Sequence, residues 1–350
     1  MTAIEVHESQ IGPGHRAEHN HFMVAIVGSG FSGLAMARAL RRAGIRDFVV
    51  LERAAGLGGT WRDNTYPGCQ CDVPSTLYSF SFAPNHRWTH TYPLQAEILQ
   101  YLHTVAHGEG LAPHIRFNHE VKAAQWDDSA KRWVLETRRG TVTADFLVFG
   151  VRALAEPSVP DVAGLSQFEG AVFHSASWNH DHDLRGERVA VIGTGASAIQ
   201  FVPRIQPGVS RLYVFQRTAP WILPHSGRLT TRLERFFWRV IPRSQHLWRG
   251  AVYAARESLV VGLAHQPRLM RALELMAKSH LRAQVPDAQL REALTPNYRL
   301  GCKRILISND YYPTLCAPNV TVVRAGLSEV RSHSVVGTDG VEREVDTISC

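Results

Sequence analysis

The sequence predicts an α/β protein made of two Rossmann-like dinucleotide-binding domains, with a helical insertion in the second. Two glycine-rich turns carry this prediction, because each follows an apolar strand and precedes a helix, at 24–33 and at 189–198. Their spacing is G-x-G-x-x-G in the first and G-x-G-x-x-A in the second, both accepted forms of the dinucleotide-binding turn. At 350 residues the chain can hold two domains that each have a core of their own.

The first glycine turn belongs to a strand, turn, helix and strand that end at Glu52. Residues 24–27 predict a buried strand, Gly28 makes the turn, and Gly30 leaves room for a pyrophosphate beside the backbone. Gly33 lets the following helix, which Phe31 opens, pack closely on the sheet with its first amides aimed at the phosphates. The strand at 47–51 ends on Glu52, whose carboxylate is placed to accept both hydroxyls of a ribose. We prefer this interpretation to a similar unit without a ligand because all five features come in order.

The second glycine turn follows a predicted strand at 189–192. We assign its cofactor contacts to Gly193, Gly195, Ala196 and Ser197. The next strand, at 212–215, ends in Gln216-Arg217-Thr218 where an acid would mark NAD. Because Arg217 could neutralise a 2′-phosphate, we expect NADP here. The alternative is that Arg217 is a surface residue at the end of a strand.

Two dinucleotide folds of these two types together imply FAD in the first and NADPH in the second. The expected chemistry therefore begins with hydride transfer from NADPH to the flavin.

Other segments have simpler patterns. A loop is expected at 56–72, a helix at 93–105, a hairpin at 133–135 and 141–149 that returns to the first sheet, and a linker at 155–160. Cys69 and Cys71 lack the C-x-x-C spacing of a redox pair. The cluster at 180–183, His-Asp-His-Asp, is assigned no metal because alternating side chains point to opposite sides of an extended chain.

The net charge of +7 has a local origin, since residues 228–286 hold eleven Lys or Arg against three Glu. Within this segment Leu233, Phe236, Phe237, Val240 and Ile241 follow helical spacing, which predicts an amphipathic helical insertion at about 228–292 with a basic outer face. We interpret the basic face as solvated, with contact to an anionic membrane surface or partner as the alternative. A nucleic-acid partner is not expected.

Cellular location follows from what the chain lacks. It has no run of 18 apolar residues, so no membrane span is expected, and residues 1–21 lack the apolar core of a secretion signal and predict a disordered leader. Five scattered cysteines do not form a disulfide framework, which favours the cytoplasm. The oligomeric state is not predicted.

Two further motifs resemble those of the Baeyer–Villiger monooxygenases, a family of flavoproteins. Residues 168–179 match its fingerprint F-x-G-x-x-x-H-x-x-x-W-[PD] at Phe168, Gly170, His174 and Trp178, with Asn179 in place of the last residue. Trp178 separates this family from related flavin monooxygenases, which have Tyr or Phe there. Residues 58–72 resemble its second signature, G-G-x-W-x-x-x-x-[FY]-P-G-x-x-x-D, at Gly58, Gly59, Trp61, Tyr66, Pro67, Gly68 and Asp72.

The resemblance implies an FAD- and NADPH-dependent enzyme that inserts one oxygen of O2 beside a ketone carbonyl, through a C4a-peroxyflavin, to give an ester or lactone. It gives Arg304 the catalytic role and Asp72 the role of orienting it. A guanidinium suits this role because it keeps its charge in a dry pocket and can stabilise an anion. The resemblance also implies that the flavin is contacted by Gly59, Thr60, Trp61, Asp72 and Tyr78. It implies that Lys303 binds the 2′-phosphate of NADP together with Arg217 and Thr218. The fingerprint residues are expected to couple the two domains.

The chain also departs from the family. Gly150-Val151-Arg152 replaces the usual Ala-Thr-Gly, and the sequence ends at 345–350 in what resembles the start of a strand. The chain is therefore expected to be truncated, with a leader at 1–21, an FAD-binding domain at 22–155, an NADP-binding domain at 156–330 and, at 331–350, the start of a return to the first domain. Two alternatives follow: a cofactor-binding remnant without turnover, and a related monooxygenase that oxidises nitrogen or sulfur.

Overall fold

The computed structural model describes residues 20–151, 156–260, 262, 266, 268 and 270–350. By their contacts these residues form two compact units, one from the described parts of Met1–Leu57 and Gly110–Val151, the other from Gly58–Glu109 and the described parts of Arg152–Cys350. Residues 58–109 thus group with the second unit, whereas we expected one unbroken first domain over 22–155. The predicted leader, apart from its last two residues, and Arg152 lie outside the described residues.

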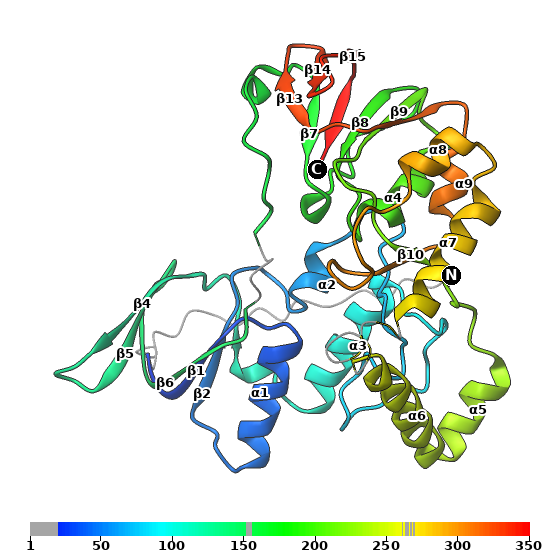
Figure 1. Ribbon diagram of the computed structural model, residues 1–350. Coiled ribbons are helices and arrows are strands. Elements are labelled where there is room, and N and C mark those ends of the chain that lie inside the picture. The colour runs from blue at the N-terminus through cyan, green and yellow to red at the C-terminus, as the bar shows by residue number, and fades with distance from the viewer. Residues whose placement is uncertain (1–19, 152–155, 261, 263–265, 267, 269) are drawn as a thin grey trace, which may run out of the picture. The chain divides into compact units, whose positions relative to one another are not determined.

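The first unit is built on a six-stranded sheet of order β3-β2-β1-β6-β5-β4 (Figure 1). Its elements are β1 (His21–Val27), α1 (Phe31–Arg42), β2 (Phe48–Leu51), η1 (Ala112–His114), β3 (Ile115–Arg116), β4 (Val121–Asp127), β5 (Arg132–Thr137) and β6 (Gly140–Phe149). All four residues of β2 are buried. The predicted hairpin is confirmed: β5 and β6 pair antiparallel, and β6 returns alongside β1 in parallel.

The first glycine turn has the close packing that its spacing predicts. Gly28 has a φ of +96°, in the region that favours glycine. A Cβ on Gly33 would lie 1.8 Å from the carbonyl oxygen of Gly28. The buried face of α1 consists of Gly33, Leu34, Ala37 and Leu40, so the helix lies directly on the turn and sheet.

The second unit is built on a five-stranded parallel sheet of order β12-β9-β8-β16-β7. Its strands are β7 (Ala171–Phe173), β8 (Arg188–Ile192), β9 (Arg211–Phe215), β12 (Val320–Val323) and β16 (Thr347–Ser349). We expected 331–350 to begin a return to the first domain. The strand expected near the end of the sequence is present as β16, which pairs with β8 and β7 and whose three residues are buried.

Smaller sheets and short helices complete the second unit. The strands are β10 (Ile222–Leu223) paired with β11 (Leu306–Ile307), and a meander of β13 (Leu327–Val330), β14 (Ser334–Gly337) and β15 (Glu342–Glu344). The helices outside the insertion are α2 (Thr60–Asp63), α3 (Gln95–Gly108), η2 (Leu165–Gln167), η3 (Ser175–Ser177), α4 (Ala198–Ile205) and α9 (Tyr311–Leu315). The helix predicted at 93–105 is therefore present as α3.

The predicted helical insertion consists of α5 (Arg232–Val240), α6 (Pro242–Val260), α7 (Met270–Gln284) and α8 (Ala288–Ala293). Its first helix differs from the prediction of an apolar inner face and a basic outer one. Trp238 is the residue of α5 that is buried, whereas the apolar stripe from Leu233 to Ile241 is exposed. Periodicity identified an amphipathic helix but not the side that packs. Among the described helices, none is long and apolar enough to cross a membrane.

Candidate functional site

The first candidate site is the turn between β1 and α1, with Glu52 at the end of β2. Glu52 is 3% exposed. Its Oε2 accepts hydrogen bonds from the backbone amide and the hydroxyl of Ser29, at 2.9 and 2.6 Å, and its Oε1 accepts one from the amide of Ala54 at 3.0 Å. Ser29, which the sequence analysis did not single out, therefore fixes the acid beside the glycine turn.

The start of α1 fits a phosphate group. Gly30 is its N-cap and makes no side-chain hydrogen bond to the first amides of the helix. Such amides carry the positive end of the helix dipole. With Glu52 they form the residue set that an adenine dinucleotide such as FAD requires.

The second candidate site is the turn between β8 and α4. Gly193 has a φ of +111°, and a Cβ added at Gly193 or Gly195 would meet no atom within 4 Å. Packing within the described chain does not explain glycine at Gly195, whereas a ligand against the backbone would. The Thr194 hydroxyl reaches the carbonyl of Thr218 at 3.5 Å, which joins the turn to the end of β9. This arrangement fits a second dinucleotide.

The residues predicted to hold a 2′-phosphate lie in two places. Arg217 is exposed two residues after the end of β9, next to Thr218. Lys303 lies with its Nζ 5.0 Å from the ring centre of Tyr298, a cation–π contact. Arg217 thus occupies the expected position at the end of the strand, and the contact described for Lys303 is with an aromatic ring.

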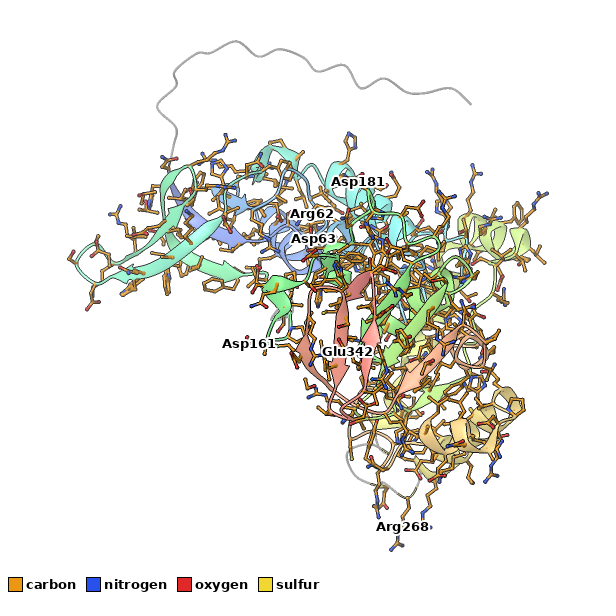
Figure 2. All side chains as sticks on the ribbon, turned by 90° about the horizontal axis from the view of Figure 1, so that it is seen from above. Arg62, Asp63, Asp161, Asp181, Arg268 and Glu342 are labelled. Atoms are coloured by element: carbon orange, nitrogen blue, oxygen red, sulfur yellow. The ribbon has the colours of Figure 1, made fainter. Side chains whose placement is uncertain are left out.

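The second signature forms a hydrogen-bonded loop in the second unit. Trp61, on α2, is 8% exposed and donates from its indole nitrogen to the hydroxyl of Tyr78 at 2.9 Å. The two rings meet edge to face, with centroids 5.5 Å apart. Gln95 at the start of α3 donates to the Trp61 carbonyl. Arg62 and Asp63, labelled in Figure 2, pair beside Trp61 at 2.8 Å. The structure therefore brings together Trp61 and Tyr78, both predicted as cofactor contacts.

Helix α4 holds the middle of this loop through Gln200. The hydroxyl of Tyr66 donates to Gln200 Oε1 at 3.0 Å, and the backbone amide of Gln70 donates to the same oxygen at 3.1 Å. The Gln200 side-chain amide donates back to the carbonyl of Gln70 at 3.0 Å. Sequence analysis missed Gln200, although its place in the helix that follows the second glycine turn was a usable signal.

Asp72 and Arg304, which are 232 positions apart, form an ion pair between Oδ2 and Nη2. The pair agrees with the expected proximity. One hydrogen bond joins the residues, and the Arg304 side chain is 59% exposed, which differs from the dry pocket expected for this guanidinium. Asp72 also lines a pocket of about 300 Å³ together with Cys71, Gln200, His225 and Asn309. Burial lowers the pKa of His225, which favours a neutral imidazole in this pocket.

A second residue that sequence analysis missed is Arg249 on α6. Its Nη1 donates to the backbone carbonyls of Thr76, Leu77 and Ser79, at 2.9, 2.9 and 3.0 Å. These carbonyls flank Tyr78, so the helical insertion fixes the segment that carries the partner of Trp61. No sequence pattern pairs an arginine with carbonyls about 170 positions away.

The fingerprint residues are partly buried within the second unit. A Cβ on Gly170 would lie 2.2 Å from the carbonyl of Asp346 and would also meet the ring of Phe168. His174 caps η3 by accepting from the amide of Ala176 at 3.0 Å, and burial lowers its pKa. Trp178 packs on Phe201 of α4, with ring centroids 5.2 Å apart. The rings of Phe201 and Tyr66 also contact each other, with centroids 6.1 Å apart. Aromatic rings therefore connect the fingerprint to the signature loop.

Two other groups of residues with possible redox or metal chemistry are the cysteines at 69 and 71 and the cluster at 180–183. Burial raises the pKa of the Cys69 thiol to about 11 and of the Cys71 thiol to about 12, so both are protonated at neutral pH. In the cluster at 180–183, the side chains make separate hydrogen bonds. His180 is hydrogen-bonded to Thr65 and His182 to Thr347, and Asp183 accepts a hydrogen bond from Arg185. Among the described residues no group of three His, Cys, Asp or Glu could hold a metal ion.

A family model described as pyridine nucleotide-disulphide oxidoreductase matches residues 25–241. A relative from Streptomyces coelicolor, named Baeyer-Villiger monooxygenase, is 54% identical over 334 residues, which are 95% of this chain and 64% of that protein. A second of the same name, from Pseudomonas aeruginosa, is 47% identical and is covered over 63% of its length. The chain thus spans somewhat less than two thirds of these relatives.

Solved structures of monooxygenases also match this chain. The fold superposes on an oxidised steroid monooxygenase bound to NADP with a TM-score of 0.82, at 32% identity, over 94% of this chain and 71% of the other. A closed crystal structure of cyclohexanone monooxygenase matches with a TM-score of 0.81 at 28% identity, over 94% of this chain and 70% of the other.

Proposed function

The chain belongs to the Baeyer–Villiger monooxygenase family, and from this premise we propose that it acts as an FAD- and NADPH-dependent monooxygenase that converts ketones to esters or lactones. One observation carries the proposal within the molecule: Arg304 and Asp72, far apart in sequence, meet at the edge of the signature loop. A generic dinucleotide-binding protein has no need of a cation held there by an acid.

The residues that would hold the cofactors divide between the two turns. Gly28, Gly30, Phe31, Gly33 and Glu52 would contact FAD, with Gly59, Thr60, Trp61, Asp72 and Tyr78 from the signature loop. Gly193, Gly195, Ala196, Ser197, Arg217, Thr218 and Lys303 would contact NADPH. When bound, the two cofactors supply hydride transfer and the activation of O2.

Arg304 would stabilise negative charge. During oxygen insertion the ketone carbonyl oxygen gains negative charge, which a guanidinium stabilises without losing its own proton. Asp72 orients the guanidinium through the ion pair and keeps it beside the loop. Gln200 and Arg249 hold the backbone on which Asp72 and Tyr78 lie, so they are positioning residues.

Several finer assignments belong to the same proposal. The fingerprint residues Phe168, Gly170, His174 and Trp178 would couple the two dinucleotide domains, here taken as 22–155 and 156–330. A cytoplasmic location is supported by five free cysteines. Cyclohexanone and steroids that carry a ketone are the first substrates to test, because cyclohexanone and steroid occur in the names of the matching structures.

The test uses the purified chain with FAD and NADPH. Ketone-dependent NADPH oxidation, together with an ester or lactone that carries one atom from ¹⁸O2, is the expected result. Arg304→Met should lose ester formation and keep FAD bound. Arg185→Met is the matched control, since Arg185 pairs with Asp183 far from the loop in sequence.

The alternatives have different outcomes. FAD binding without a ketone-dependent product would indicate a cofactor-binding remnant. Preference for an amine or thioether over every ketone would indicate oxidation of nitrogen or sulfur. Either result contradicts the proposed function.

A further inference from the structure

The first helix of the insertion presents an apolar surface that the rest of the described chain does not cover. We call Leu233, Phe236, Phe237, Val240 and Ile241 the α5 stripe. Its members are between 46% and 63% exposed, whereas Trp238 on the same helix is 9% exposed. Exposed apolar groups of this size and continuity usually mark an interaction surface.

The geometry of α5 points the stripe outward. At about 100° per residue, the centre of the stripe lies roughly 140° around the helix from Trp238, the side chain that packs on the protein. Figure 1 shows α5 beside the first part of α6. Exposed apolar residues continue onto α6 at Leu247 and Trp248, which are 76% and 56% exposed.

The helix is held in shape without help from the stripe. Thr231 accepts from the amide of Glu234 at 3.1 Å, and Glu234 accepts from the amide of Thr231 at 2.8 Å, which together form a capping box. Arg228 adds a hydrogen bond of 2.6 Å to the Glu234 carboxylate. The stripe is therefore presented on a preformed helix.

The charges beside the stripe are positive. Arg232, Arg235 and Arg239 lie along one flank of the helix, and Arg243 follows on α6. The acid of α5, Glu234, is already paired with Arg228. A second copy of this chain placed on the stripe would bring these arginines against their counterparts, which is unfavourable. An anionic surface meets both the charge and the apolar side chains.

We propose that α5 docks on an anionic phospholipid surface, with the stripe entering the boundary between headgroups and acyl chains and the arginines contacting lipid phosphates. Phe and Leu on one face with Arg on the other is the pattern of helices that lie in a membrane interface. Such a helix rests on the bilayer and does not cross it, which agrees with the absence of a spanning helix among the described residues.

Vesicle cosedimentation tests this proposal with the purified full chain. We expect binding to phosphatidylcholine vesicles with about 30% phosphatidylglycerol. Binding to phosphatidylcholine alone should be roughly 100-fold weaker, at about a factor of five for each of the three arginines of α5. Phe236→Ser with Phe237→Ser should lose binding, and Arg232→Gln with Arg239→Gln should weaken it at least tenfold. Binding needs neither cofactor nor ketone, so it is tested apart from the monooxygenase activity.

Matched controls separate the stripe from a general effect of basic charge. Val341→Ser changes an apolar residue of similar exposure, 49%, in the β14–β15 turn, and Arg138→Gln with Arg139→Gln removes two exposed charges after β5. Both should bind as the parent does, and circular dichroism should be unchanged in all variants. The proposal is overturned by no vesicle binding, by equal loss in the controls, or by unchanged binding of the double Phe variant. A dimer in light scattering that Phe236→Ser abolishes, without vesicle binding, would assign the stripe to a second copy.

Discussion

The hydroxyl of Tyr66 donates a hydrogen bond of 3.0 Å to Gln200 Oε1, and this contact joins the signature loop to the helix of the second glycine turn. Tyr66 is 7% exposed, and burial raises its pKa, so it remains a neutral donor. The same glutamine makes two hydrogen bonds to the backbone of Gln70, two residues before Asp72. The position of the acid that meets Arg304 therefore depends on a residue of α4.

Replacing Gln200 should loosen the loop. Gln200→Leu leaves the buried Tyr66 hydroxyl and the Gln70 amide without their acceptor, which should lower the free energy of unfolding by about 1–3 kcal/mol. Urea titration measures the loss. Tyr66→Phe should cost less in the Gln200→Leu background than in the parent, since the two changes remove one shared contact. Additive losses would contradict the coupling.

Replacing Gly33 should disrupt the first unit. In Gly33→Ala the new Cβ would lie 1.8 Å from the Gly28 carbonyl oxygen, and backbone atoms cannot give way as a flexible side chain does. We expect a loss of at least about 2 kcal/mol in unfolding free energy, measured by thermal or urea unfolding. Gly56→Ala, where the Cβ would meet no atom within 4 Å, should change stability little. Similar losses in both variants would contradict the packing argument.

Cofactor choice should depend on Arg217. Arg217→Gln removes the charge at the end of β9, so the KM for NADPH should rise about 10- to 100-fold while the KM for NADH changes little. Steady-state oxidation of both cofactors measures the ratio. Arg211→Gln, at the other end of β9, is the control. Equal effects on NADPH and NADH would contradict a role of Arg217 in binding the 2′-phosphate.

The sequence predicted local features better than distant contacts. Spacing alone predicted the turn at Gly28 and Gly33, the hairpin and the helix α3, because each depends on neighbours in the chain. It could not predict Gln200 and Arg249, whose partners are backbone groups 130 or more positions away. The meeting of Arg304 with Asp72 was expected through a family resemblance. The orientation of α5 was predicted wrongly, because periodicity does not identify which partner a helix face will meet.

Arg249 should control the mobility of the segment around Tyr78. Arg249→Met removes hydrogen bonds from a charged donor to three carbonyls, so amides of residues 77–80 should exchange hydrogen faster, by about 10- to 100-fold. Hydrogen exchange with mass spectrometry measures the change. Arg243→Met, at an exposed position on the same helix, should leave exchange at 77–80 unaltered. Arg249→Lys keeps the positive charge but replaces the guanidinium with an ammonium, which we do not expect to bind all three carbonyls in the same way. If this variant protected the amides of residues 77–80 as fully as the parent does, the charge alone would be sufficient and the geometry of the guanidinium would not matter.

Acid should weaken the start of α5 through Glu234. Hydrogen bonds from Arg228 and then from Thr231 lower the pKa of Glu234 to about 2 from its ordinary 4.5. Because the folded state binds this proton less readily than the unfolded state, the contribution is complete above pH 4.5 and is lost as the pH falls toward 2. The pair is solvent-exposed, so its size should stay below about 1 kcal/mol. The unfolding free energies of the parent and Glu234→Gln should therefore differ at neutral pH and converge near pH 2. Glu136→Gln, at an exposed position on β5, is the control. Its difference from the parent in unfolding free energy should not shrink in this way as the pH falls. A gap between the parent and Glu234→Gln that stays constant from neutral pH to pH 2 would show that the carboxylate charge does not stabilise the helix start.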